Sequence, residues 1–231
     1  MRSILFEEFN ERAKEVSKYL MFIKNLEQET VQLSIGIPGK EKIRKIDSDL
    51  EKTLKASGFL MLYNLIESTM RNAIHVIFDE LSSEGISFDE MKYHLKTIII
   101  KNIKKNHSPD KLLNNIQSIS VDIISASFDR DKLFSGNLDA GKIKDIAKEY
   151  GFSYTTNARK TGNGSDLLTI KTNRNDLAHG FYSFNDVGKD VSADELLRIK
   201  RTVVFYLREI LQNIENYLAN RDYLDSSGRT P

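Results

Sequence analysis

The sequence predicts an all-α protein, organised as an up-and-down helical bundle. Apolar residues recur at helical spacing in several long segments. Only three prolines occur in 231 residues, so the chain can form long uninterrupted helices. Apolar residues make up 40% and charged residues 29%, a balance typical of globular proteins. We expect one domain over residues 1–224 and a flexible tail over residues 225–231.

Two long helices are expected in the first third of the chain. The first covers about residues 3–29 and is additional to the core bundle. The second begins near Ser48, which forms a capping-box pattern with Glu51, and continues to about Leu81. Residues 59–66 are apolar nearly all round, which indicates a central helix with neighbours on several sides.

A mixed insertion is expected between core helices, at about residues 83–165. Ser87 and Glu90 form another capping-box pattern, which predicts a helix that carries apolar residues through Ile99. A basic run comes after this helix, and it includes Lys101, Lys104 and Lys105.

The rest of the insertion gives weaker signals. Residues 119–128 fit either a strand or an irregular apolar segment. Residues 139–150 predict a short helix that Gly151 terminates, and the polar residues 155–165 predict a loop.

The last third returns to clear helical patterns. Residues 166–179 predict a helix, and Gly180 is the usual left-handed residue after a helix end. Ser192 and Glu195 open the final helix, whose near-heptad apolar stripe indicates bundle packing or a dimer seam.

The segment Arg174-Asn175-Asp176-Leu177-Ala178-His179 combines groups suited to phosphate chemistry. An imidazole titrates near neutrality and can act as a general base or acid. An arginine supplies a permanent cation whose planar donor fork matches phosphate. The bland alternative is that both side chains cap helix carbonyls and pair with Asp176.

The spacing of these residues argues against one self-sufficient site. Five residues on an ideal helix correspond to about 140° of rotation, so Arg174 and His179 point in different directions. Asn175 and His179 are four apart and share a face. Two copies related by a two-fold axis could bring an arginine and a histidine together, which is a reason to expect a homodimer.

The sequence contains its own control for this pattern. Arg71-Asn72-Ala73-Ile74-His75 is a near match that lies inside an apolar helix, and we interpret His75 as a packed helix residue. Spacing alone is therefore a weak signal, and the helix end before Gly180 is what distinguishes the second segment.

The segment from Arg174 to Gly180 resembles the hallmark of the HEPN superfamily: arginine, a polar residue, three more residues and histidine. Phe134-Ser135-Gly136-Asn137-Leu138-Asp139, with Ile143 and Gly151 after it, is similar to the subfamily described as MAE_28990/MAE_18760-like. The resemblance spans about residues 50–218. It implies a helical-bundle dimer with both motifs at the interface.

The resemblance also implies metal-independent RNA cleavage, in which the ribose 2′-hydroxyl attacks the neighbouring phosphate. His179 would move the proton, Arg174 would stabilise the phosphorane, and Asn175 would orient the phosphate or the imidazole. Many such proteins are toxins or phage-defence effectors, with an antitoxin or another defence protein as partner. Others have lost the motif and only bind.

Several other residues are candidates for supporting roles. Asp176 lies within the motif. HEPN proteins often place polar groups of the central helix near the active site, which implicates Glu67 and Arg71; an ordinary intrahelical ion pair is the alternative. Lys101, Lys104 and Lys105 could track an RNA backbone, although a solvated face explains them equally simply.

Composition restricts the remaining functions. The chain has no cysteine, which excludes disulfides and thiolate metal sites, and its four histidines are too scattered for a zinc site. We therefore expect no metal and no cofactor. Acidic residues interrupt the N-terminal apolar run, and no stretch suits a bilayer, so we expect a cytoplasmic protein. Two alternatives stay open: a non-catalytic dimer that binds RNA or a partner protein, and a purely structural helical adaptor.

Overall fold

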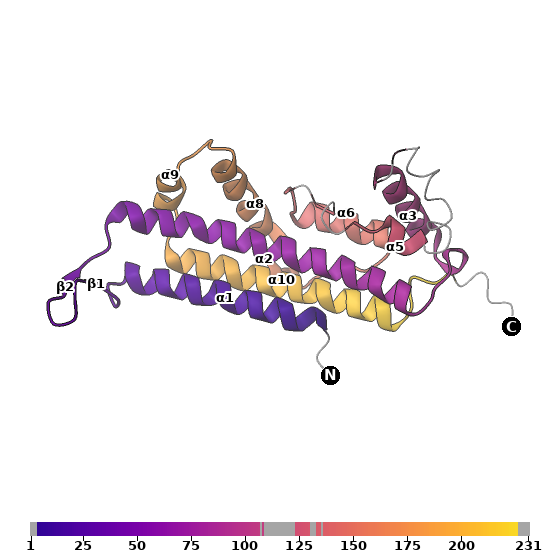
Figure 1. Cartoon of the computed structure of the whole chain (residues 1–231), viewed down its shortest axis with the longest axis horizontal. Coiled ribbons are helices and arrows are strands. Elements are labelled where there is room, and N and C mark those ends of the chain that lie inside the picture. The colour runs from indigo at the N-terminus through magenta and orange to yellow at the C-terminus, as the bar shows by residue number, and fades with distance from the viewer. Residues whose placement is uncertain (1–3, 107, 109–122, 130–132, 135, 226–231) are drawn as a thin grey trace. The chain divides into compact units, whose positions relative to one another are not determined.

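The computed structural model describes residues 4–106, 108, 123–129, 133–134 and 136–225 (Figure 1). Their regular secondary structure is helical apart from one short β-hairpin and an isolated bridge, which confirms the all-α fold class. They group into two compact units, Met1–Glu67 with Asn157–Leu207, and Ser68–Thr156 with Arg208–Pro231. Two long helices, α2 (Ser48–Ser83) and α10 (Ala193–Ala219), contribute a part to each unit. The single domain stays a prediction.

The first unit is built on three long helices: α1 (Ile4–Glu27) and the adjoining parts of α2 and α10. The apolar face of α1 is buried, including Phe9, Leu20 and Ile23. Gly58 of α2 allows the three helices to approach closely. A Cβ at Gly58 would lie 3.1 Å from a methyl group of Leu20 and 3.3 Å from one of Leu196.

A buried charge cluster joins these three helices. Lys55 of α2 is only 8% exposed, and its ammonium lies 3.2 Å from a carboxylate oxygen of Glu27 and 3.2 Å from one of Glu51. The second oxygen of Glu27 accepts a hydrogen bond from the backbone N–H of Ala193, at 3.0 Å. The buried ammonium is therefore compensated, and the end of α1 is tied to the start of α10.

The start of α2 differs from the predicted capping box. Asp47 caps this helix, because its carboxylate accepts a hydrogen bond from the Leu50 N–H at 2.9 Å. Ser48 is already helical, and Glu51 turns to Lys55. Asp47 and Ser48 are both good capping residues, so pattern alone placed the cap one residue too late.

Shorter elements complete the first unit. Residues 36–39 lie within the connection of an antiparallel hairpin whose middle pair is Ser34 and Ile43. The predicted loop over residues 155–165 is partly helical. The bounds are β1 (Leu33–Ile35), β2 (Lys42–Arg44), α7 (Ala158–Thr161), the 3₁₀ turn η3 (Gly162–Gly164), α8 (Ser165–Ala178) and α9 (Phe184–Lys189).

The second unit contains η1 (Phe88–Glu90), α3 (Tyr93–Asn106), α5 (Ile123–Ser127) and α6 (Ala140–Tyr150). The predicted box of Ser87 and Glu90 forms, but it opens the short η1, and α3 begins later. Residues 123–127 are helical rather than a strand or an irregular segment, and residues 119–122 lie outside the described residues.

The predicted short helix before Gly151 is confirmed as α6, and its buried side chains belong to the core of the second unit. The carbonyl of Tyr150, at the end of α6, lies 2.8 Å from the donating Tyr217 hydroxyl and 3.1 Å from His94 Nε2. Burial raises the pKa of the Tyr150 and Tyr217 phenols, so both stay neutral hydroxyls at physiological pH.

Candidate functional site

The helix that carries the Arg174 segment is anchored at its first turn. Asp166 of α8 is 8% exposed, and its carboxylate accepts two hydrogen bonds from the Arg198 guanidinium of α10, at 2.9 and 3.1 Å. Hydrogen bonds to Glu195 and then to Asp166 raise the pKa of Arg198. This bidentate pair fixes the start of α8 against α10 within the first unit.

Arg174 is held in place by two neighbours. Its guanidinium carbon lies 4.7 Å from the centre of the Tyr63 ring, on the buried face of α2, in cation–π geometry. Its Nη1 also donates to the Asn175 side-chain oxygen, at 3.0 Å. Arg174 is half-buried, so an ordered cation reaches the surface at this point of α8. These contacts differ from the alternative pairing with Asp176.

His179 lies at the helix end, as predicted from Gly180. Gly180 adopts a left-handed φ of 70°, and its N–H donates to the Leu177 carbonyl. The Phe181 N–H donates to the Asp176 carbonyl at 2.9 Å, which completes a Schellman motif. The imidazole is exposed, and its closest described ring contact is Phe181, at 5.7 Å between ring centres.

The surface beside His179 carries large apolar side chains. Phe181 is 72% exposed and Tyr182 is 57% exposed, in the turn between α8 and α9. Leu168, about three helical turns before His179 on α8, is 53% exposed. The two large exposed side chains that follow His179 are suited to contact with another molecule.

Within one copy of the chain, the geometry of α8 directs the side chains of Arg174 and His179 to different sides of the helix. His179 keeps near-helical angles (φ −94°, ψ −2°), so the expected rotation of about 140° from Arg174 persists. Asn175 links the two along the helix, since its side chain accepts from Arg174 and its carbonyl accepts from the His179 N–H at 2.9 Å. The geometry therefore positions each group separately.

The other candidate residues are divided between the two units. Glu67 belongs to the first unit, on α2, one helical turn after Tyr63. Arg71 belongs to the second unit, where its guanidinium carbon lies 5.6 Å from the centre of the Phe134 ring. Three exposed lysines lie on the C-terminal half of α3, also in the second unit: Lys101, Lys104 and Lys105. The roles of all five stay predictions.

Tyr63 is the site residue that the sequence did not reveal. It lies within the continuous apolar stretch of α2, and nothing in the sequence connects it with an arginine so much later in the chain. Across the described ranges, no three histidine, aspartate or glutamate side chains gather as a metal site would require.

Comparison with known proteins adds the family. The family model for MAE_28990-like HEPN proteins matches residues 1–223. The chain belongs to this HEPN family. The match includes α1 and all the described helices of both units, so it extends well beyond the motif. No curated protein and no solved structure matched this HEPN chain. None of its described helices combines the length and apolar character that a membrane span needs.

Proposed function

We propose that this HEPN protein is a metal-independent endoribonuclease whose site is formed by Arg174, Asn175 and His179. The supporting observation is the contrast within α8: Tyr63 and Asn175 hold the arginine, while the histidine is exposed at the helix end. An ordered cation for phosphate and an accessible imidazole are the two groups that phosphodiester transfer without a metal requires.

The proposed reaction is an attack of the ribose 2′-oxygen on the adjacent phosphorus. His179 accepts the 2′-hydroxyl proton as the new P–O bond forms, and the bond to the 5′-oxygen breaks. The leaving 5′-oxygen takes up a proton, which gives a 5′-hydroxyl end and a 2′,3′-cyclic phosphate. Arg174 stabilises the negative charge that develops on the phosphorane oxygens.

The proposed active form is a homodimer, because the arginine and the histidine of one α8 face different directions. A two-fold axis beside the helix end would bring Arg174 of one copy near His179 of the other. Exposed Leu168, Phe181 and Tyr182 supply apolar surface for such a contact. Asp176, which lies next to Asn175 in the same motif, would have a supporting role in the site.

We further propose that the enzyme acts as a toxin or anti-phage effector, restrained by an antitoxin or another defence protein. Lys101, Lys104 and Lys105 would contact the RNA backbone. The alternative is a HEPN dimer that binds RNA or a partner protein without cutting. Retention of both arginine and histidine favours the enzyme over this alternative.

Cleavage of total RNA by the purified protein in excess EDTA tests the proposal. His179→Ala and Arg174→Ala should each abolish most cleavage, with unchanged circular dichroism. Arg201→Ala, an exposed arginine on α10, is the matched control and should cut normally. A 5′-hydroxyl and a cyclic phosphate should be detected on the products.

Three outcomes would contradict the proposal. Cleavage that EDTA stops would mean that a metal is needed. Cleavage that persists in both motif variants would come from another site or a contaminant. RNA that is bound but left intact by the parent protein would favour the binding alternative.

A further inference from the structure

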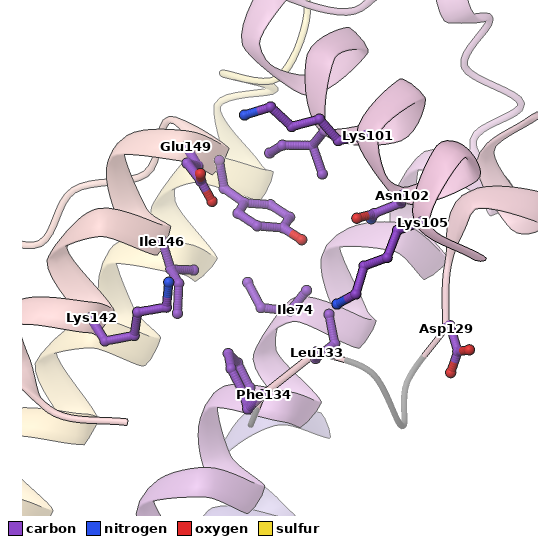
Figure 2. Close-up of a pocket in the computed structure, with 12 residues that line it drawn as sticks. Ile74, Lys101, Asn102, Lys105, Asp129, Leu133, Phe134, Lys142, Ile146 and Glu149 are labelled. Carbon is purple, nitrogen blue, oxygen red and sulfur yellow. The ribbon is translucent and has the colours of Figure 1, made fainter. Parts of the chain in front are cut away.

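The second unit contains a pocket whose lining includes none of Arg174, Asn175 and His179 (Figure 2). Its volume is about 140 Å³. Its walls come from α2, α3, α6 and the segment that includes Phe134. The pocket is therefore built from parts of the chain that are distant in sequence, rather than from the surface of one helix.

Cations from two helices line this pocket. Lys101 and Lys105 are one helical turn apart on α3, and Lys142 comes from α6. Figure 2 shows the ammonium of Lys105 reaching toward the middle of the pocket, with the ammonium of Lys142 on the opposite side. Lys104, on the same helix as Lys105, is not among the lining residues. Ammonium groups on two walls favour a ligand with concentrated negative charge, such as a phosphate monoester.

The remaining lining residues suit a ring next to that charge. Ile74, Ile146 and Phe134 provide an apolar surface, and an apolar or aromatic surface accepts the face of a nucleobase. The Asn102 amide can both donate and accept hydrogen bonds at a base edge. The Glu149 and Asp129 carboxylates also line the pocket, where they can accept from ribose hydroxyls or a base amine and disfavour further ligand phosphates.

From this arrangement we infer that the pocket binds a nucleoside monophosphate, with its phosphate between Lys105 and Lys142 and its base against Phe134 and Ile74. The ligand is either a free nucleotide or the 5′-phosphorylated end of an RNA strand, which present the same chemistry. The inference does not depend on cleavage at His179, which belongs to the other unit.

Calorimetric titration of the full-length protein tests this site. The probes are AMP, adenosine, inorganic phosphate, and a five-nucleotide RNA with or without a 5′-phosphate. The test variant is Lys105→Gln with Lys142→Gln. The matched control is Lys144→Gln with Lys148→Gln, which removes the same charge from exposed positions of α6 outside the pocket lining. His179→Ala is titrated in parallel.

AMP binding that is weakened at least tenfold in the test variant and less than twofold in the control supports the site with a free nucleotide as ligand. The same pattern for the 5′-phosphorylated RNA alone supports it with the RNA end as ligand. Normal AMP binding by His179→Ala would separate this site from the ribonuclease motif.

Equal losses in test and control variants would mean general charge attraction and would overturn the inference. Inorganic phosphate that binds as tightly as AMP would remove the role of the apolar wall, and the nucleotide assignment with it. Absence of binding for every probe would also overturn it. Circular dichroism of both double variants excludes misfolding as the cause of a loss.

Discussion

Two segments of this protein carry nearly the same residues in different surroundings: Arg71 to His75 within α2, and Arg174 to His179 at the end of α8. In both, the arginine lies over an aromatic ring, Phe134 in one case and Tyr63 in the other. In both, the histidine ring lies near a phenylalanine, at 5.3 Å from Phe128 and 5.7 Å from Phe181.

The two segments differ in the course of the chain after the histidine. The helix continues past His75, and the next turn supplies Asp79, whose carboxylate lies 2.8 Å from His75 Nδ1. The helix ends at His179, and Gly180 turns the chain away, so no further helical turn covers that ring. Helix position, rather than local composition, decides which imidazole is accessible for chemistry.

The largest expected effect separates the two histidines by function. His179→Ala should lower RNA cleavage by about 10²- to 10⁴-fold, because the group that moves the proton is lost. His75→Ala should leave the rate within about twofold, since its ring is engaged within its own helix. Initial rates on a defined fluorogenic RNA measure both. Equal losses in the two variants would show that the helix end is not the distinguishing feature.

The next largest expected effect is a difference in the free energy of unfolding between alanine variants of two glycines that end helices. Gly151→Ala should destabilise the protein by about 2 kcal/mol, from left-handed strain and from collision with His94, which would lose its contact to the Tyr150 carbonyl. Gly180→Ala has open space around its Cβ and should cost about 1 kcal/mol of strain alone. Urea unfolding measures both free energies. A larger cost at Gly180 would mean that the motif end is packed rather than open.

A smaller effect is expected from the ring under Arg174. Tyr63→Leu removes the cation–π contact, worth roughly 0.5–2 kcal/mol, and should slow cleavage about two- to thirtyfold. Tyr63→Phe keeps the ring and should retain most activity. If the leucine and phenylalanine variants of Tyr63 behave alike, the ring does not position Arg174.

The smallest effect is expected at the His75 partner. Asp79→Asn weakens a largely exposed pair within one helix, so unfolding free energy should fall by about 0.3–0.5 kcal/mol. Added salt should reduce the difference, because exposed charges are screened. A loss of RNA cleavage in this variant would show that the α2 segment contributes to chemistry after all.

The long helices were predictable because their apolar periodicity reports burial directly. Gly151 and Gly180 were predictable too, since few residues other than glycine adopt the left-handed angles at a helix end. The six-residue helix α9 was too short for a periodic signal, although Ser183 and Asp186 form a capping box in the structure. Short elements are decided by packing rather than by their own sequence pattern.

The site was half predictable for the same reason. Arg174, Asn175 and His179 lie within one helix and its end, so their spacing could be read from the sequence. The contact of Arg174 with Tyr63 depends on how α8 packs against α2 in the first unit, which no local pattern specifies. The convergence of Lys105 and Lys142 on one pocket likewise depends on tertiary packing.

The charge cluster around Glu27 has a practical consequence for fragment design. A fragment that starts near Leu50, to keep only the part that resembles the family motif, would lose Glu27 and Leu20 together. The Ala193 N–H would then lack its carboxylate acceptor. The surface of α2 around Gly58, which Leu20 covers in the full chain, would be exposed to water. Fragments for expression, labelling and crystallisation of the Arg174 segment should therefore begin upstream of α1, with any affinity tag placed before Ile4.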